Sequence, residues 1–384
     1  MTENNASGSS VSAIDAYLNS SAAAAQRFTG TANADILTGT TGADVLEGLA
    51  GDDTYYVNHS GDVIVELANG GSDTVYTSVN YTVADNVEYV HLSGPGLTVT
   101  GSAYTNNVFH VGTAGGNVLD GGGAGNSLSY ATSTTGVTAA FAPVGGPMTA
   151  RAGSDVLANF NAVIGSKFDD VLTGNELKNI LVGGLGNDTL QGGKGDDILA
   201  GAAGNDTYVF ARGDGADIIS EANEAGSRDV VSFLAGVSAE QLWFRQVGTN
   251  LEVSTIGTND KITVNGWYAA AGASIEEFRM ADGRVLLGSQ VQNLVQAMAG
   301  LTPPPAGQLT LPAGTAAILA PVLAQNWRSA QQFSAVSQGG LGGWQADSAQ
   351  LVQAMAGFAV PAAASAPWSG HGNPSTQIQL AAVH

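Results

Sequence analysis

Residues 165–209 read GSKFDDVLT, GNELKNILV, GGLGNDTLQ, GGKGDDILA and GAAGNDTYV, which are five rows of nine in one unbroken phase. Glycine opens every row, an acid or amide fills the sixth place, and a large apolar or aromatic residue fills the eighth. The sixth places hold Asp170, Asn179, Asp188, Asp197 and Asp206, and the eighth places hold Leu172, Leu181, Leu190, Leu199 and Tyr208. Because the polar and apolar places keep a fixed spacing, the stretch predicts a repeated structural unit.

Each row combines a glycine-rich turn with a short strand. Glycine at the first, second and fourth places permits backbone angles closed to other residues and lets carbonyl oxygens crowd inward. Such a turn, ending in a carboxylate, suits calcium, a hard cation that takes about six to eight oxygen ligands at about 2.3–2.6 Å. The x-U-x triplet that follows predicts a short strand whose single inward side chain packs in a core.

Two rows make one coil of eighteen residues, with strands on two faces and turns on two edges. Sixth places eighteen residues apart therefore share an edge. This stacks Asp170, Asp188 and Asp206 on one edge, and Asn179 with Asp197 on the other. Each neighbouring pair can hold an ion between turns, so the block predicts about three calcium ions.

On these rows the chain resembles the RTX (haemolysin-type) calcium-binding repeat proteins, whose nonapeptide is G-G-x-G-x-D-x-U-x. The resemblance implies an all-β fold, a right-handed parallel β-roll or β-solenoid of nonapeptide repeats with a C-terminal β-rich cap and a partly helical tail. It also implies bound Ca²⁺ and export from a Gram-negative cell by the type I secretion apparatus, through an uncleaved C-terminal signal. The expected location is extracellular or on the cell surface.

The candidate metal ligands are the sixth-place side chains and, in the last three rows, the residues at the first and third places. They are Asp35, Asp44, Asp53, Asp170, Asn179, Gly183, Leu185, Asp188, Gly192, Lys194, Asp197, Gly201, Ala203 and Asp206. We assign no catalytic residue and no cofactor other than calcium.

A shorter block, GTANADILT, GTTGADVLE and GLAGDDTYY, occupies residues 30–56. Asp35 and Asp53 share one edge of its coils, whereas Asp44 on the other edge has no obvious partner. We expect about one calcium ion here, bound more weakly than in the main block. Residues 56–111 lose the glycines but keep strand-like pieces, and they resemble the calcium-free coils that interrupt RTX solenoids.

Two rows, GTAGGNVLD and GGGAGNSLS, open at residues 112 and 121 and carry Asn117 and Asn126 in place of the acid. An amide contributes only a neutral oxygen, so these rows are expected to keep the fold without a metal. Residues 129–164 continue the strand-like pattern, and 30–210 therefore predicts one continuous solenoid. The alternative is two separate β-rolls joined by a β-rich spacer.

The nonapeptide pattern ends at Val209, and longer apolar segments follow. The pieces VVSFL, QLWFRQV, LEVSTI, KITVNGWY, IEEFRM and RVLL look like antiparallel strands. Residues 211–300 resemble the haemolysin-type calcium-binding-related region, a cap that would cover the last strand edge. Its aromatic residues are expected in the core: Trp243, Phe244, Trp267, Tyr268 and Phe278.

Apolar residues at 291, 294, 295 and 298 predict one face of a helix. The heptapeptide LVQAMAG at 294–300 recurs at 351–357. Residues 301–384 form an Ala/Pro/Gln-rich tail, expected to be partly helical and to carry the secretion signal. Residues 1–29 are a polar, then Ala-rich leader, either a short capping helix or disordered.

The composition is acidic and free of cysteine. There are 33 acids against 12 bases, a net charge of −21, which favours divalent cations and disfavours nucleic acid and anionic membranes. With no Cys, calcium would take the stabilising role that disulfides have in many secreted proteins. The sequence has no apolar run of about eighteen residues to span a membrane. Its first residues lack the pattern of a Sec-type signal peptide.

Motifs of common hydrolases are missing. The sequence has neither a G-x-S-x-G serine motif nor an H-E-x-x-H zinc motif, and the nearest approximation is AVSQG around Ser337. The five histidines, His59, His91, His110, His371 and His384, are expected to be separate surface imidazoles. Adjacent acids such as Asp52 and Asp53 should diverge on a tight turn. Since solenoid, cap and tail use every stretch, we expect no catalytic domain of ordinary size.

The leading hypothesis is a calcium-dependent structural or adhesion protein that folds outside the cell. One alternative is a calcium-dependent extracellular enzyme, of the hydrolase or polysaccharide lyase/epimerase type, that uses the solenoid face. Another is a self-assembling surface-layer or biofilm component. The expected partners are calcium ions, the type I secretion apparatus, and cell-surface polysaccharide or further copies of the chain.

Overall fold

The computed structural model describes residues 24–112, 115–123, 125–141, 148–149, 155–221, 226–269 and 275–329. The chain divides into two compact units, residues 1–332 and 333–384, and the second lies outside the described residues. Most of the leader, the second LVQAMAG copy and residues 330–384 of the tail expected to carry the secretion signal also lie outside them.

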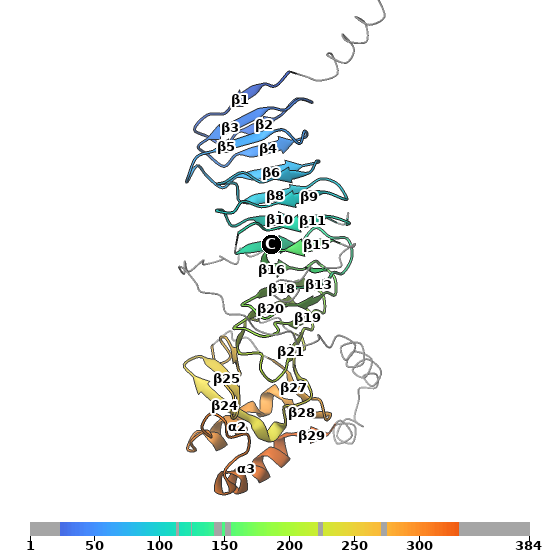
Figure 1. Cartoon of the computed structure of the whole chain (residues 1–384). Helices are drawn as coiled ribbons and strands as arrows, with labels where there is room; N and C mark the ends of the chain where they lie inside the picture. Colours follow the sequence, from blue (N-terminus) through green and yellow to red (C-terminus); the bar gives the residue numbers. More distant parts are fainter. Residues whose placement is uncertain are drawn as a thin grey trace, which may run out of the picture. The chain divides into compact units, whose positions relative to one another are not determined.

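The first unit is a β-solenoid of about ten turns followed by a small β-rich and helical region. One sheet of 13 strands runs through it (Figure 1). In spatial order its strands are β2 (Ile36–Thr38), β4 (Thr54–Val57), β6 (Thr74–Thr77), β8 (Tyr89–Leu92), β10 (Val108–His110), β12 (Asn126–Ser129), β16 (Phe160–Ile164), β18 (Ile180–Leu185), β20 (Ile198–Ala203), β22 (Ala216–Ile219), β26 (Lys261–Val264), β25 (Asn250–Thr255) and β24 (Leu242–Val247). Because the glycine rows and the stretch between them share this sheet, the solenoid is continuous, as predicted, and not two separate rolls.

Three shorter sheets receive the intervening strands. The first contains β1 (Arg27–Thr29), β3 (Val45–Leu49) and β5 (Val63–Glu66). The second contains β14 (Met148–Thr149), β15 (Val156–Ala158), β11 (Val118–Asp120), β9 (Thr98–Thr100) and β7 (Tyr81–Thr82). The third contains β13 (Thr138–Ala140), β17 (Val171–Thr173), β19 (Thr189–Gln191), β21 (Thr207–Phe210), β23 (Val230–Phe233), β27 (Glu277–Met280), β28 (Arg284–Leu287) and β29 (Arg328–Ser329).

The parallel register within the rows is eighteen residues. Val171 pairs with Thr189 in one sheet, and Ile180 pairs with Ile198 in the other. The eighth-place residues from Leu172 to Tyr208 are all fully buried and form the core. The period of nine in the sequence is therefore half a coil, and its apolar place is the one inward side chain of each short strand.

The parallel ladder continues beyond the glycine rows. We expected Val230–Phe233 to be antiparallel, and this is wrong, because β23 pairs in parallel with both β21 and β27. The strand β22 likewise pairs in parallel with β26. Antiparallel pairing is found in β24–β25–β26 and β27–β28–β29, where hairpins fold back on the last parallel strands. A further parallel strand can therefore pair with the free edge of the last strand even where the connecting turn is not glycine-rich.

Helices complete the first unit. The predicted apolar face lies on α2 (Val291–Met298), whose residues at 291, 294, 295 and 298 are buried. A second helix, α3 (Ala313–Asn326), packs beside it, and two short 3-10 turns, η1 (Ala239–Gln241) and η2 (Gly288–Gln290), precede strand β24 and helix α2. Trp243, Phe244 and Phe278 are buried and Trp267 and Tyr268 pack against them, so these aromatic residues form a core as predicted.

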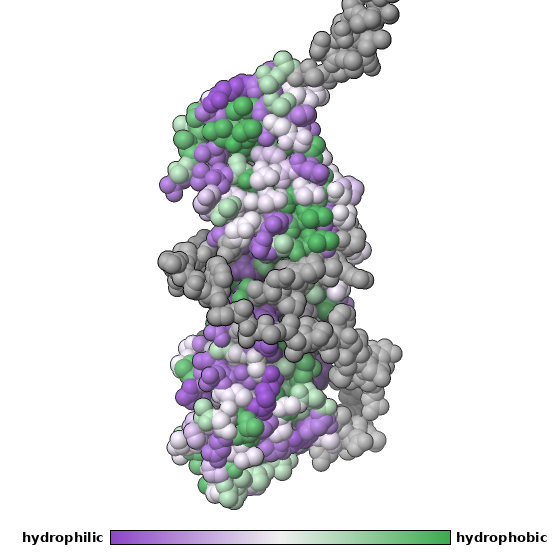
Figure 2. All heavy atoms as spheres, viewed as in Figure 1, coloured by the Kyte–Doolittle hydropathy of each residue, from purple (hydrophilic) through white to green (hydrophobic). Residues whose placement is uncertain are grey.

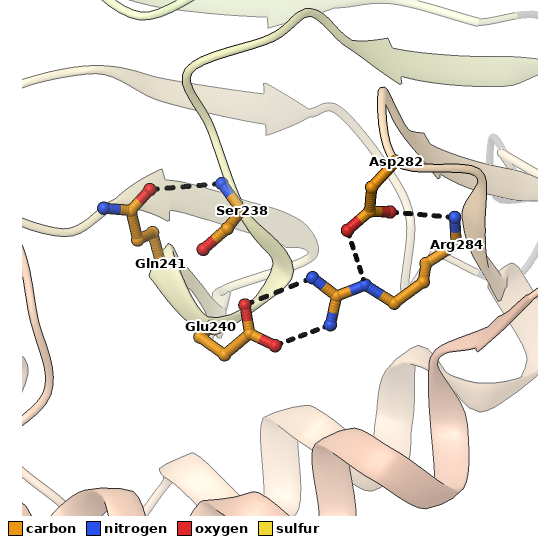
Figure 3. Close-up of polar contacts among 5 residues, drawn as sticks. All are labelled: Ser238, Glu240, Gln241, Asp282 and Arg284. Atoms are coloured by element: carbon orange, nitrogen blue, oxygen red, sulfur yellow. Dashed lines mark hydrogen bonds and ion pairs between the residues drawn. The ribbon is translucent and has the colours of Figure 1, made fainter.

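A polar cluster joins η1 to the turn before β28 (Figure 3). The guanidinium of Arg284 donates to both carboxylate oxygens of Glu240 and, through Nε, to Asp282 at 2.8 Å. The hydrogen bonds from Arg284 outweigh burial and lower the pKa of Glu240 to about 2. The ion pairs are partly exposed, so they position these turns more than they stabilise the fold.

The surface carries apolar and polar groups side by side. Figure 2 shows small hydrophobic and hydrophilic patches alternating on the viewed face. Exposed apolar side chains such as Ile36 and Leu177 are scattered along the solenoid, as on most protein surfaces. Within the residues that the structure describes, no helix is long and apolar enough to cross a bilayer.

Candidate metal centres

The sixth-place side chains form hydrogen-bonded columns along the two turn edges. The backbone N–H of Asp170 donates to Oδ1 of Asp188, and that of Asp188 donates to Oδ1 of Asp206, both at 2.8 Å. On the other edge the N–H of Asn179 donates to Oδ1 of Asp197 at 2.7 Å. All five side chains are at most 1% exposed. The carboxylates of Asp188, Asp197 and Asp206 thus turn back toward the preceding coil and accept a backbone hydrogen bond there.

The second oxygen of these carboxylates faces the turn. Oδ2 of Asp188 and Oδ2 of Asp197 are buried and receive no hydrogen bond. A Cβ added to Gly183 would collide with Oδ2 of Asp188 and approach the carbonyl oxygen of Gly201 within 2.8 Å. A Cβ on Gly192 would collide with Oδ2 of Asp197 in the same way. Glycine at the first place therefore leaves a small space where carboxylate and carbonyl oxygens converge.

The pKa values of Asp188 and Asp197 are raised, so their buried positions disfavour the ionised form of the carboxylate. Burial, together with the charges of Asp206 and Asp170, raises the pKa of Asp188 to about 8. Burial also raises the pKa of Asp197 to about 6. A buried carboxylate without a donor needs either a proton or a cation. The donor set is hard oxygen only, so the residues present fit calcium.

The comparison with protein-family models agrees with this geometry. Residues 29–58 and 173–208 match the RTX calcium-binding nonapeptide repeat (4 copies). Residues 250–290 match the haemolysin-type calcium binding protein related domain. The chain is an RTX haemolysin-type calcium-binding nonapeptide repeat protein. Its RTX repeats bind calcium, and the bound ion supplies the positive charge that the turn oxygens lack.

Several carbonyl ligands expected from the RTX rows have other contacts. The carbonyl oxygen of Gly201 faces the Asp188 turn, as described above. The carbonyl oxygen of Ala203 accepts a hydrogen bond from the N–H of Gly186 at 2.9 Å. The side chain of Lys194 is exposed and pairs with Glu176 at 3.4 Å. Leu185 is 53% exposed. Because the side chains of Leu185, Lys194 and Ala203 offer no oxygen, these third places can bind an ion only through backbone carbonyls.

The second place of an RTX row decides whether the carboxylate is already satisfied. In the row that opens at Gly165, the N–H and hydroxyl of Ser166 both donate to Asp170. In the first block Thr31 and Thr40 donate to Asp35 and Asp44 in the same manner. Rows with glycine at this place leave the carboxylate oxygen free. The sequence contained this signal, but the alignment of rows by glycine and acid alone did not use it.

The carboxylate columns continue into coils that lie beyond the glycine rows. The N–H of Asp44 donates to Oδ1 of Asp62 at 2.9 Å, so our expectation that Asp44 lacks a partner is wrong. On the other edge of the first block the column runs from Asp35 through Asp53 and Asp73 to Glu88.

The main block is extended in the same way. Asp206 is followed by Asp229 and Glu276, and Asp197 is followed by Asp217. The rows that supply these additional acids lack an opening glycine, and most contain inserted residues. A search at a fixed period of nine therefore misses them.

The asparagine rows satisfy their turns without an ion. Oδ1 of Asn126 accepts from the N–H of Asn107 at 2.7 Å, and its Nδ2 donates to the carbonyl of Gly123 at 2.7 Å. Oδ1 of Asn117 likewise accepts from the N–H of Leu97 at 2.9 Å. In the Asn126 turn the side-chain amide donates to the carbonyl oxygen of Gly123, so this oxygen is already paired and not free for a calcium ion. This arrangement favours the expectation that these rows are metal-free.

Two of the histidines are not separate surface imidazoles, and our expectation for them is wrong. The rings of His91 and His110 stack with centroids 4.2 Å apart, and Tyr76 stacks on His91 at 4.5 Å. Neighbouring coils place these residues directly opposite one another on β6, β8 and β10. Because each ring face is covered by the next ring, the ladder stabilises the sheet. His371, His384 and Ser337 lie outside the described residues.

Proposed function

We propose that this RTX protein is secreted and folds outside the cell when calcium fills the turns of its solenoid. The supporting observation is the column of stacked, buried carboxylates with oxygens that receive no hydrogen bond, as at Asp188 and Asp197. Adjacent coils are about 4.8 Å apart. At an effective dielectric constant of 20, two unit charges at this distance repel by about 3.5 kcal/mol. Without a cation the charged columns therefore oppose the coiled state.

The same electrostatics suits export of an open chain. The net charge of −21 and the glycine-rich turns disfavour compaction where free calcium is scarce. Outside the cell calcium binds the folded form and not the open form. Binding at a concentration 100 times the dissociation constant adds about 2.7 kcal/mol per site to the stability. Several such sites along one solenoid are enough to convert an open chain into a folded one.

The experiment is a calcium titration of the full chain, followed by far-UV circular dichroism and calorimetry. We expect β structure to develop cooperatively with calcium, with midpoints in the micromolar to millimolar range and about three ions in residues 165–209. Magnesium, which demands a smaller octahedral site, is the control and should act only weakly. A chain that is fully coiled in chelator, or that takes up no calcium, would contradict the proposal.

We further propose a structural or adhesive role in place of catalysis. In each of the three adjacent acid pairs of the turns, one member is buried in a column and the other is exposed. The buried members are Asp53, Asp170 and Asp197, and the exposed members are Asp52, Asp169 and Asp196. The buried members thus have a structural explanation and do not face one another as a catalytic pair would. Hydrolysis of esters, casein or uronate polymers by the calcium-loaded protein would contradict this proposal. Light scattering with and without calcium tests whether the role involves self-assembly.

A further inference from the structure

Two clusters of three acids lie at the ends of the glycine-row blocks. One comprises Asp53, Glu66 and Asp73, and the other comprises Asp206, Glu221 and Asp229. In each cluster one ligand oxygen per residue lies within 4.8 Å of the others. Both follow the same pattern in the sequence, an acid at the sixth place of the last glycine row, a glutamate at the start of the next coil, and a further aspartate.

The glutamate enters the coil where an opening glycine stands one coil earlier. Val65 pairs with Glu47 and Glu66 pairs with Leu49, so Gly48 forms a bulge against which the Glu66 carboxylate lies. Ile219 pairs with Leu199, so Glu221 follows at the level of Gly201. In both blocks the next coil carries this glutamate where the row before it carries an opening glycine. A glutamate carboxylate can supply oxygens in its place.

Tyrosine replaces leucine in the core at these same two rows. The eighth place is Tyr55 in one block and Tyr208 in the other, and each hydroxyl donates to Oε1 of the glutamate. Tyr208 also accepts from the N–H of Gly201 at 2.7 Å. The hydroxyl thus anchors the glutamate so that its carboxylate stays over the turn.

The first cluster contains two buried carboxylate oxygens that receive no hydrogen bond. Asp53 and Asp73 are 1% and 0% exposed, and Oδ2 of each receives no hydrogen bond. A Cβ added to Gly48 would collide with Oδ2 of Asp53, Oε1 of Glu66 and the Tyr55 hydroxyl together. These three oxygens therefore converge on one small space. Two carboxylates that face each other there need a cation or a shared proton.

We propose that Glu66 and Glu221 each complete a three-carboxylate calcium site that closes its block of rows. These sites are distinct from the row sites because a glutamate side chain replaces the carbonyls of a glycine turn. Three carboxylates and no nitrogen or sulfur donor select a hard divalent cation, and the larger calcium tolerates such irregular geometry better than magnesium. The inference builds on the proposed calcium-dependent folding, but it predicts two additional ions.

The test compares Glu66→Gln, Glu221→Gln and the double variant of the full chain with the control Glu47→Gln. Glu47 neighbours Gly48 but pairs with Arg27 outside the cluster. Glutamine keeps an oxygen for the tyrosine hydroxyl and removes the charge. Calorimetry and equilibrium dialysis with calcium should show one ion fewer in each single variant and two fewer in the double variant. The control should bind as many ions as the wild type.

An unchanged ion count in both single variants would overturn the proposal and leave the shared proton as the explanation. Because the row sites remain, these variants should still coil with calcium, so loss of the end sites is distinguishable from failure of calcium-dependent folding. If a glutamine variant does not fold, Tyr55→Phe provides the second test. It keeps all three carboxylates but should lose the share of tyrosine-excited terbium luminescence that comes from this site, and the share from Tyr208 should remain. The control is Tyr104→Phe, which changes an exposed ring. Equal luminescence in these two variants would also overturn the proposal.

Discussion

At the scale of single residues, two acids of the same kind differ in what surrounds the second carboxylate oxygen. Oδ2 of Asp188 receives no hydrogen bond, whereas Oδ2 of Asp35 accepts from the N–H and hydroxyl of Thr31. Asp188 also lies mid-column, between Asp170 and Asp206, so it adjoins the turns on both sides. Its charge is therefore available to two neighbouring ions.

Asp188→Ala should weaken calcium-induced folding more than Asp35→Ala does. Removing a carboxylate shared by two sites should raise the calcium midpoint about tenfold, equivalent to about 1.4 kcal/mol. The loss should also loosen the coils on both sides, because coils of a solenoid are stabilised by their neighbours. Circular dichroism during calcium titration measures the midpoints. Equal midpoints for both variants and the wild type would refute the stacked-column arrangement.

Ser166→Ala should have opposite effects on the calcium-free and calcium-bound forms. The hydroxyl donates to Oδ1 of the buried Asp170 at 2.9 Å. Its loss should lower the stability of the calcium-free form by about 1–2 kcal/mol. Oδ1 then keeps only the N–H of Val137 as a donor and can contribute more to a calcium ion, so the stabilisation gained on adding calcium should increase. Thermal melting in chelator and in calcium measures both effects, with the exposed Ser78→Ala as control. A uniform loss in both conditions would show that Ser166 is only structural.

At the scale of elements, rows with aspartate and rows with asparagine build the same coil by different means. Asn126→Ala should leave the calcium count unchanged, because its amide already bridges Asn107 and Gly123. The variant should lose about 1–3 kcal/mol of stability, since it leaves buried backbone groups unpaired. Calorimetry gives the ion count and denaturant unfolding gives the stability. A lost ion would show that the amide oxygen is a ligand after all.

The aromatic ladder on β6, β8 and β10 should make the solenoid sensitive to mild acid. Burial, with the neighbouring His110, lowers the pKa of His91 to about 4, below its ordinary value of 6.5. The unfolded chain therefore binds a proton that the folded chain excludes, and stability should fall as the pH drops from 6.5 toward 4. Allowing for screening at a half-buried ring, the loss is about 1–2 kcal/mol. His91→Tyr, which keeps a stacking ring, should remove this part of the pH dependence in calcium-loaded melting curves.

At the scale of the whole molecule, protons should partly replace calcium. Burial raises the pKa of Asp188 and of Asp217 to about 8, and the ordinary value of both is 3.8. Such groups stabilise the calcium-free fold at low pH, and this contribution is lost as the pH rises through about 8. In chelator the protein should therefore gain β structure between about pH 8.5 and about pH 6.5, before the histidine ladder acts in the opposite direction. The calcium midpoint should rise over the same interval, because the ion must displace protons. A calcium midpoint independent of pH would contradict this linkage.

The sequence alone determined the repeating unit. The fixed phase of Asp188 and Leu190, and of their counterparts in the other rows, predicted the eighteen-residue coil, the buried apolar places and the stacking of acids along an edge. These features depend on local turns and strands of constant length. Residues that repeat at a fixed interval in the sequence therefore lie at equivalent positions in successive coils. The helix at 291–298 was predicted for the same reason.

Only the tertiary structure decided what happens where the period is interrupted. Asp62 continues one carboxylate column in phase, although its row lacks the opening glycine, and Asp73 continues the other column twenty residues after Asp53. Glu66 reaches the turn of Gly48. The parallel pairing of Val230–Phe233 and the stacking of His91 on His110 were likewise not evident from the sequence. The physical reason is that strands join the ladder through backbone hydrogen bonds, whatever the length of the loop between them. Inserted turn residues shift the sequence period but leave the side chains in the same columns.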